Sequence, residues 1–218
     1  MKLHLIWDMD GTLVNSEPEI LATISISLKQ FGLSVEDANP ALRIGPPLPE
    51  MLRSSFSEEQ LSDEQINEVI KSFRLIYDSS DFNMTLPYEG INELIHCTDY
   101  VHHVITNKPD YATKRIIDKK GWSGQIVEVL TPNTLMSEVG RQMTKPELFK
   151  TFRSMYPDVN IVGIGDMAKD AECARSVGIP AVGVLWGTGT MEELMDAGCD
   201  EIVSDIDELI EVLPKYCK

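Results

Sequence analysis

The chain has 218 residues, 43% hydrophobic and 25% charged, which suits a globular protein with one α/β domain of about 130 to 150 residues and a smaller second unit. Its 35 acidic residues outnumber the 19 basic ones, and the net charge of −16 argues against nucleic acids and anionic membranes as partners, because both select basic surfaces. No apolar stretch approaches the roughly 20 residues of a membrane span, and the N-terminal run Leu3–Trp7 is too short for a signal peptide, so we expect a soluble cytoplasmic protein.

Short apolar runs, typical of buried strands, alternate with helical patterns along most of the chain. The expected strands are Leu3–Trp7, Val101–Thr106, Ile126–Leu130, Asn160–Ile164 and Ala181–Trp186, with Glu201–Val203 as a weaker candidate. The expected helices between them are 112–120, 146–155, 168–177 and one that follows a Thr190–Glu193 capping box and runs to Ala197. This alternation predicts an α/β class, doubly wound fold with a parallel sheet covered on both faces.

The segment from residue 15 to residue 85 interrupts this alternation, because it shows helical patterns and no convincing strand. A helical insert of this size, directly after the first strand, predicts a separate all-α cap domain over residues 15–85. The α/β core would then be discontinuous and would comprise residues 1–14 and 86–218.

Two helices of this insert are expected from their N-terminal signals. Ser16 with Glu19, and Ser62 with Gln65, have the spacing of a capping box, in which each side chain bonds the backbone N–H of the other residue. Apolar residues at helical spacing follow each pair, so each is expected to begin an amphipathic helix.

The first polar signal is the sequence Trp-Asp-Met-Asp-Gly-Thr-Leu at residues 7–13. It places Asp8 and Asp10 two residues apart at the carboxyl end of the first strand, where open α/β sheets bind ligands. Gly11 allows a sharp turn, and its N–H is expected to face a phosphate. An ordinary strand-to-loop transition is the alternative interpretation, but it does not explain an apolar run that ends abruptly in two carboxylates.

Three further polar signals follow at strand or helix ends. Thr106 and Asn107 end the second strand, where a hydroxyl and an amide can hold a phosphate oxygen. Lys145 begins a helix, where the dipole disfavours a cation unless an anion is bound nearby. Asp166 and Asp170 lie four residues apart across a strand–helix turn. Each signal alone also has a structural explanation, as a strand end, a solvated lysine or a helix cap.

Taken in order, the four signals resemble the motifs of the haloacid dehalogenase superfamily phosphatases: D-x-D-G-T, a Ser or Thr, a Lys, and G-D-x-x-x-D. The resemblance spans nearly the whole chain. Pro87-Tyr88-Glu89-Gly90, Val184-Leu185-Trp186-Gly187 and the helical insert are similar to the phosphoglycolate phosphatase and β-phosphoglucomutase branch. The resemblance implies a Mg²⁺-dependent phosphatase for a small phosphorylated metabolite, such as phosphoglycolate or a sugar phosphate, with an aspartyl-phosphate intermediate.

The resemblance also implies roles for individual residues. Asp8 would be the nucleophile, and Asp10 would protonate the leaving oxygen and later activate water. The transferring phosphoryl group would be bound by Gly11, Thr106, Asn107 and Lys145.

The implied Mg²⁺ ligands are the Asp8 carboxylate, the backbone carbonyl of Asp10 and Asp166, with Thr12 and Asp170 in supporting positions. A cation is also expected on physical grounds, because converging carboxylates repel by about 4 kcal/mol per pair at about 4 Å and an effective dielectric of about 20. Ligands that are all oxygen favour Mg²⁺ over zinc.

Several positions leave the assignment open. Asn15 stands where members of this family often have Asp, and the stretch 133–143 does not match close relatives. Lys108 is the alternative phosphate-binding lysine. Arg43, directly before residues 44–48, is the expected cap contact with the substrate, and a solvated surface arginine is the alternative interpretation.

Other functions also remain open. A phosphomutase would use the same residues, and a binding protein could retain the fold without catalysis. Dehalogenation is disfavoured, because it needs neither a second acid nor a metal. The oligomeric state is not indicated.

The cysteines and histidines are expected to be structural. The four cysteines, at positions 97, 173, 199 and 217, are widely spaced and form no C-x-x-C pair, which indicates reduced thiols. His102 and His103 lie within an apolar segment, where structural histidines are expected.

Overall fold

The structure, a computed structural model that describes residues 2–134 and 140–217, divides into two units. One unit comprises Met1–Asn15 with Pro87–Lys218, and the other comprises Ser16–Leu86. The chain passes between them at β2 (Val14–Asn15) and β3 (Leu86–Pro87), which pair as a two-stranded sheet. No helix within the described residues has the length and apolarity needed to cross a membrane.

The larger unit is built on a six-stranded parallel sheet with the strand order β5-β4-β1-β6-β7-β8. The strands are β1 (Leu3–Trp7), β4 (Tyr100–Ile105), β5 (Ile126–Leu130), β6 (Ile161–Gly165), β7 (Ala181–Val184) and β8 (Glu201–Val203). The strands expected from the apolar runs are confirmed, including the weaker candidate at Glu201–Val203.

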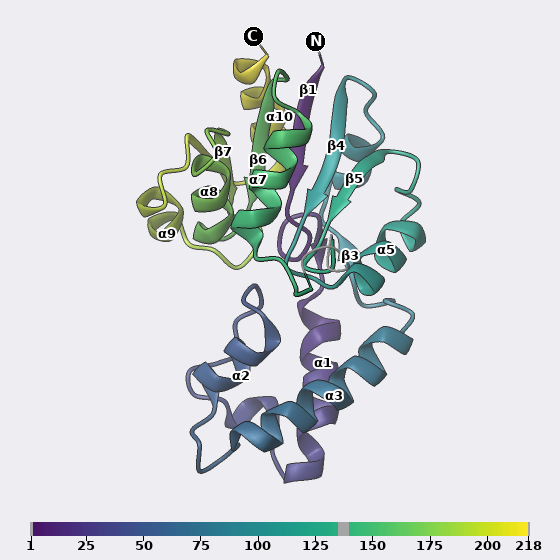
Figure 1. The fold of residues 1–218 in the computed structure, drawn as a ribbon, viewed down its shortest axis with the longest axis vertical. Coiled ribbons are helices and arrows are strands. Elements are labelled where there is room, and N and C mark those ends of the chain that lie inside the picture. The colour runs from purple at the N-terminus through teal and green to yellow at the C-terminus, as the bar shows by residue number, and fades with distance from the viewer. Residues whose placement is uncertain (1, 135–139, 218) are drawn as a thin grey trace. The chain divides into compact units, whose positions relative to one another are not determined.

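Helices cover this sheet, and the doubly wound α/β fold is confirmed. They are α4 (Ile91–Ile95), α5 (Asp110–Lys119), α7 (Lys145–Met155), α8 (Ala168–Arg175), α9 (Met191–Asp196), α10 (Ile206–Val212) and the 3-10 helix η3 (Leu213–Tyr216). In Figure 1, α7 and α8 lie in front of the sheet, and the yellow C-terminal segment that includes α10 lies behind it. Phe149 and Phe152 of α7 and Ala174 of α8 are buried in the core that these layers enclose.

The topology brings three strand ends together. β1 lies between β4 and β6, and the chain places β4 and β5 on one side of β1 before it returns to build the other side. Trp7, the last residue of β1, lies opposite Val104 and Ile164 in the two neighbouring strands. Open α/β sheets bind ligands at such a reversal of strand order, outside the carboxyl ends of the strands. The residues that follow β1, β4 and β6 therefore lie where a ligand would bind.

Three histidines of this unit, His4, His102 and His103, lie on the neighbouring strands β1 and β4. Trp7 Nε1 donates a hydrogen bond to His102 Nδ1 over 3.2 Å, and His103 Nε2 lies 2.9 Å from His4 Nδ1. Burial lowers the pKa of His103 to about 3, so its ring is neutral. All four cysteines are free thiols, as expected.

The smaller unit is helical. Its helices are α1 (Glu17–Leu28), α2 (Leu48–Ser55) and α3 (Asp63–Ser79), with 3-10 helices η1 (Lys29–Phe31) and η2 (Val35–Asp37). α3 packs against both α1 and α2. Ring contacts extend this core, since the centroids of Phe73 and Tyr77 are 4.9 Å apart and those of Tyr77 and Phe82 are 5.2 Å apart.

One of the two capping boxes expected in this unit is confirmed and the other is wrong. The Ser62 amide donates to Gln65 Oε1 over 2.9 Å, and the Gln65 amide donates to Ser62 Oγ. The Ser16 side chain makes no capping bond to α1. The Glu19 carboxylate instead accepts from the amides of Met84 and Thr85 and from Thr85 Oγ1, at 3.0 to 3.1 Å. Three donors to one buried carboxylate outcompete the single local bond of a capping box.

Candidate active site

Acidic side chains gather at the carboxyl ends of β1 and β6. Asp8 and Asp10 follow β1, Asp166 follows β6, and Asp170 lies in the first turn of α8. The Asp8 amide donates to the Ile164 carbonyl over 2.9 Å, which extends the β1–β6 ladder into the site. One carboxylate oxygen from each of Asp8, Asp166 and Asp170 lies within 4.8 Å of the other two. The fold therefore brings together residues that lie far apart in the sequence.

Lys145 is the cation of this cluster. It is the first residue of α7, and the Thr144 amide donates to Glu147 Oε2 over 2.8 Å in the capping box that starts the helix. Its Nζ lies 2.5 Å from Asp8 Oδ1 and also bonds Asp170 Oδ1. Burial opposes the charged form of Lys145, but the carboxylates of Asp170 and Asp8 outweigh burial and raise its pKa. Lys145 is therefore charged and in place beside Asp8.

Asp10 has a different lysine as its partner. Lys108 Nζ lies 2.7 Å from Asp10 Oδ1 and 3.0 Å from Oδ2, and the two side chains are only 4% and 15% exposed. The sequence indicated Lys108 only as an alternative phosphate ligand. Its contact with Asp10 was missed, because 98 residues separate the two and no local pattern joins them.

Asp166 is held on both of its carboxylate oxygens. Thr12 Oγ1 donates to Oδ1 over 3.1 Å, while the amide and Oγ1 of Thr188 donate to Oδ2 over 2.8 Å and 3.1 Å. Burial raises the pKa of Asp166, and these hydrogen bonds oppose that rise. Thr188 was missed from the sequence; the Gly-Thr-Gly that follows β7 was the only signal, and such a sequence is common in loops.

Gly11 makes the expected sharp turn, but its N–H has a different partner from the expected one. Its N–H was expected to face a phosphate, but it donates to the Val14 carbonyl over 2.9 Å. Gly11 has a φ of +81°, and a Cβ at this position would collide with the Asp166 carboxylate. The glycine therefore lets the β1 turn approach Asp166 closely.

The remaining residues expected at the site lie in different places. Thr106 is buried directly after β4, and its Oγ1 accepts from the Lys108 amide over 3.1 Å. Asn107 is half-buried in the same turn. Arg43 is exposed in the Ser16–Leu86 unit, ahead of α2, and its role stays a prediction. Of the unmatched stretch 133–143, residues 135–139 lie outside the described residues.

The charge balance of the site fits a bound divalent cation. Four carboxylates, those of Asp8, Asp10, Asp166 and Asp170, face the two lysines Lys108 and Lys145. Burial raises the pKa of Asp8 to about 7 even though Lys145 acts in the opposite direction. A divalent cation would offset the excess negative charge. The ligands are carboxylate oxygens, which suit a hard cation such as Mg²⁺.

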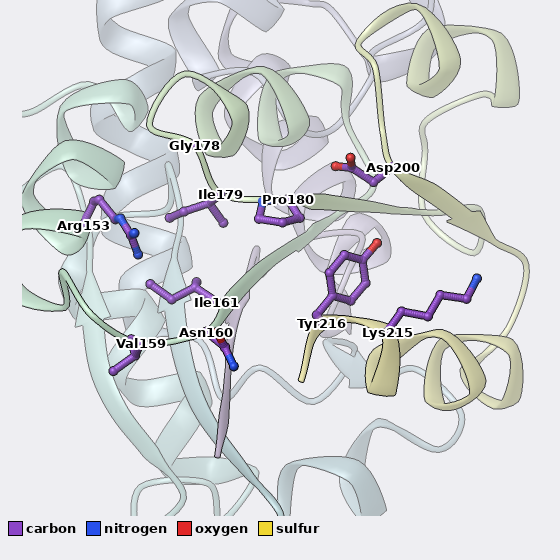
Figure 2. A pocket seen from close by; sticks show the side chains of 10 residues that line it. All are labelled: Arg153, Val159, Asn160, Ile161, Gly178, Ile179, Pro180, Asp200, Lys215 and Tyr216. Atoms are coloured by element: carbon purple, nitrogen blue, oxygen red, sulfur yellow. The ribbon is translucent and has the colours of Figure 1, made fainter. Parts of the chain in front are cut away.

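A separate cavity of about 400 Å³ lies at the amino-terminal ends of β6 and β7 (Figure 2). Arg153, Asn160 and Tyr216 are among the residues that line it. The carboxylates described above follow the opposite ends of the strands, so this cavity is not part of the candidate active site.

Comparisons with known proteins match most of the chain. The family model described as "Haloacid dehalogenase-like hydrolase" matches residues 5–184, which include Asp8, Asp10, Thr106, Lys145 and Asp166. A curated "Phosphoglycolate phosphatase" from Xylella fastidiosa (strain 9a5c) is 26% identical over 195 residues, which are 87% of this chain and 82% of that protein.

Solved structures show the same fold. A "predicted phosphatase" from Clostridium acetobutylicum superposes with a TM-score of 0.82 and 24% identity, and the match covers 99% of each chain. A "predicted phosphoglycolate phosphatase" from Haemophilus somnus 129pt has a TM-score of 0.77 and 21% identity over 96% of each chain. At these identities, the structural likeness shows the architecture rather than the substrate.

Proposed function

The chain belongs to the haloacid dehalogenase-like hydrolase family and is a phosphatase, and we propose that it hydrolyses a small phosphorylated metabolite with Mg²⁺ through an aspartyl-phosphate on Asp8. The observation that carries this proposal is the position of the Asp8 carboxylate. It lies 2.5 Å from a buried, charged lysine and within 4.8 Å of two further carboxylates at a sheet edge suited to ligand binding.

In the first step, a carboxylate oxygen of Asp8 attacks phosphorus, and the bond between phosphorus and the ester oxygen breaks. Asp10 gives a proton to that leaving oxygen, which departs as an alcohol. A carboxylate and a phosphate dianion repel each other, so attack requires positive charge beside the nucleophile, and Lys145 supplies one such charge at 2.5 Å.

In the second step, Asp10 accepts a proton from a water molecule as that water attacks phosphorus. The bond between Asp8 and phosphorus breaks, inorganic phosphate leaves, and the Asp8 carboxylate is restored. Asp8, Asp166 and the backbone carbonyl of Asp10 would hold the Mg²⁺, with Asp170 close by, and the ion when bound supplies charge stabilisation for the phosphoryl oxygens.

Small carboxylated phosphate esters of the phosphoglycolate type are the substrates we propose. The support is the curated relative of that name, which aligns with 87% of the chain. Core residues that contact only the phosphoryl group cannot distinguish one phosphomonoester from another, so we place specificity in the Ser16–Leu86 unit acting as a cap.

The experiment that tests this function measures phosphate release from a panel of phosphorylated metabolites and from p-nitrophenyl phosphate, with Mg²⁺ and after chelation. We expect release that is lost on chelation and restored by Mg²⁺, with 2-phosphoglycolate among the best substrates. Release that is unaffected by chelation would refute the metal requirement. Interconversion of sugar phosphate isomers without net release would show a phosphomutase instead.

Arg43→Ala is expected to raise the KM for the preferred carboxylated substrate by about 10 to 100-fold, as for the loss of a charged hydrogen bond. It should leave p-nitrophenyl phosphate unaffected, because that substrate has no distal anion. Arg53→Ala is the matched control, since Arg53 belongs to the same unit and pairs with Asp63 on the surface over 2.8 Å. Unchanged kinetics on the preferred substrate would show that Arg43 is a solvated surface residue that does not bind the substrate.

A further inference from the structure

We infer that Lys108 is a positioning residue for this reaction: it holds the Asp10 carboxyl group in the orientation from which, when protonated, it passes its proton to the leaving oxygen. The inference rests on the proposed function, because it concerns the proton transfer assigned to Asp10. The resemblance to known phosphatases gives Lys108 no such role, and the sequence suggested phosphate binding for it instead.

Lys108 contacts Asp10 through both carboxylate oxygens, an arrangement that we call the clamp. Lys108 Nζ contacts both oxygens of Asp10, at 2.7 and 3.0 Å. An ammonium group has three N–H donors, and two of them are directed at this one carboxylate. Contact with both oxygens restricts rotation of the carboxylate, whereas a single bond would leave it free to turn. The lysine side chain is only 4% exposed, so water competes little for these donors.

The backbone on each side of the pair is also fixed. The Lys108 amide donates to Thr106 Oγ1 over 3.1 Å, and its carbonyl accepts from Thr113 Oγ1 of α5 over 3.3 Å. On the other side, the turn after β1 is closed by bonds from the Gly11 amide to the Val14 carbonyl and from the Leu13 amide to the Met9 carbonyl. A clamp between two fixed turns can set the position of Asp10 with the precision that proton transfer requires.

The two lysines of the site have separate carboxylate partners. Lys145 bonds Asp8 and Asp170, and Lys108 bonds Asp10. When Asp10 gives its proton to the leaving oxygen, it becomes a carboxylate, and Lys108 lies within hydrogen-bond distance to offset that new charge. A lysine that bound the phosphoryl group instead would aid every substrate equally, whatever its leaving group, and this difference allows a test.

The test compares Lys108→Met, Asp10→Asn and the double variant on an alkyl phosphate and on p-nitrophenyl phosphate, whose leaving group needs little protonation. For Lys108→Met we expect kcat on the alkyl phosphate to fall by about 10 to 100-fold, within the range for general acid catalysis, and kcat on p-nitrophenyl phosphate to fall by less than about 3-fold. KM should change little for either substrate. The double variant should be no slower than Asp10→Asn, because the clamp has no purpose without the acid.

Two control variants distinguish the loss of the Lys108–Asp10 contact from a general effect of removing a lysine. Lys169→Met removes an exposed lysine that pairs with Glu172 over 3.1 Å, and it should leave both rates unchanged. Lys108→Arg keeps donors for the carboxylate and should retain more alkyl phosphatase activity than Lys108→Met. If Lys108→Met does not fold, as judged by thermal unfolding, Lys108→Gln takes its place in the same comparison.

Equal losses of kcat on both substrates, or a raised KM for both, would overturn the inference and make Lys108 a phosphate ligand. A loss of kcat in the double variant equal to the product of the two single-variant losses would overturn it as well. Neither result would contradict the proposed function. That function is tested separately, by the Mg²⁺-dependent phosphate release of the unaltered protein.

Discussion

Asp8→Asn is expected to lower kcat by at least about 10³-fold, or roughly 4 kcal/mol in activation free energy, with every phosphate ester. An amide cannot form the aspartyl-phosphate, and better binding of the substrate cannot bypass that step. The substitution also removes one of the three carboxylates that lie within 4.8 Å of one another. Steady-state kinetics on p-nitrophenyl phosphate and on the best metabolite measures this loss.

The stability of the same variant is the measurement that distinguishes a chemical loss from a structural one. Burial raises the pKa of Asp8 to about 7 from an unfolded value of 3.8, so between these values the folded state holds a proton that the unfolded chain releases. The contribution of Asp8 to the unfolding free energy therefore falls as the pH rises from about 4 to about 7. Without metal at pH 8, Asp8→Asn should be at least as stable as the unaltered protein, and this advantage should disappear near pH 4.

Asp158→Asn is a suitable control for both measurements, because it makes the same chemical change at an exposed turn. It should alter neither the rate nor the stability curve. Substantial phosphatase activity in a well-folded Asp8→Asn protein would contradict the mechanism.

Asp10→Asn is expected to lower kcat on alkyl phosphates by about 10² to 10⁴-fold, the usual contribution of a general acid. The loss should be much smaller with p-nitrophenyl phosphate, whose leaving group departs without a proton. Metal affinity should be affected less than in Asp166→Asn, because Asp10 is proposed to bind the ion through its backbone carbonyl and Asp166 through its side chain. Activity titrations with Mg²⁺ compare the two variants.

Two outcomes would count against this assignment of Asp10. Equal losses on the alkyl and nitrophenyl esters would show that Asp10 is not the acid. A larger loss of Mg²⁺ affinity in Asp10→Asn than in Asp166→Asn would place the Asp10 side chain on the ion.

The strands and the strand ends were predictable, because their signals are local. The run Leu3–Trp7 is apolar except for His4, and Ile161–Gly165 is buried throughout, which is typical of a parallel sheet covered on both faces. The polar residues after these runs, Asp8 and Asp166, meet at one edge because parallel strands all end there. The sequence therefore predicted the α/β fold and the place where these carboxylates converge.

The side-chain partners were not predictable, because they are long-range. The bond between Asp10 and Lys108 spans 98 residues, and the contacts of Glu19 with Met84 and Thr85 span 65 and 66. The Ser16–Glu19 pair had the correct spacing for a local capping box, but the tertiary structure offered Glu19 more donors. The bond from the Gly11 amide to the Val14 carbonyl is local, but residue spacing alone did not show that this amide is occupied.

The central claim, that Asp8 is the residue that carries the phosphoryl group, is tested most directly by rapid acid quenching during turnover. The protein is mixed with a substrate labelled with ³²P at the phosphoryl group, quenched within milliseconds, digested, and mapped by mass spectrometry. We predict label on the peptide that contains Asp8, formed at least as fast as steady-state turnover and absent in Asp8→Asn. Rapid turnover with no labelled protein, or label on another residue, would contradict the account.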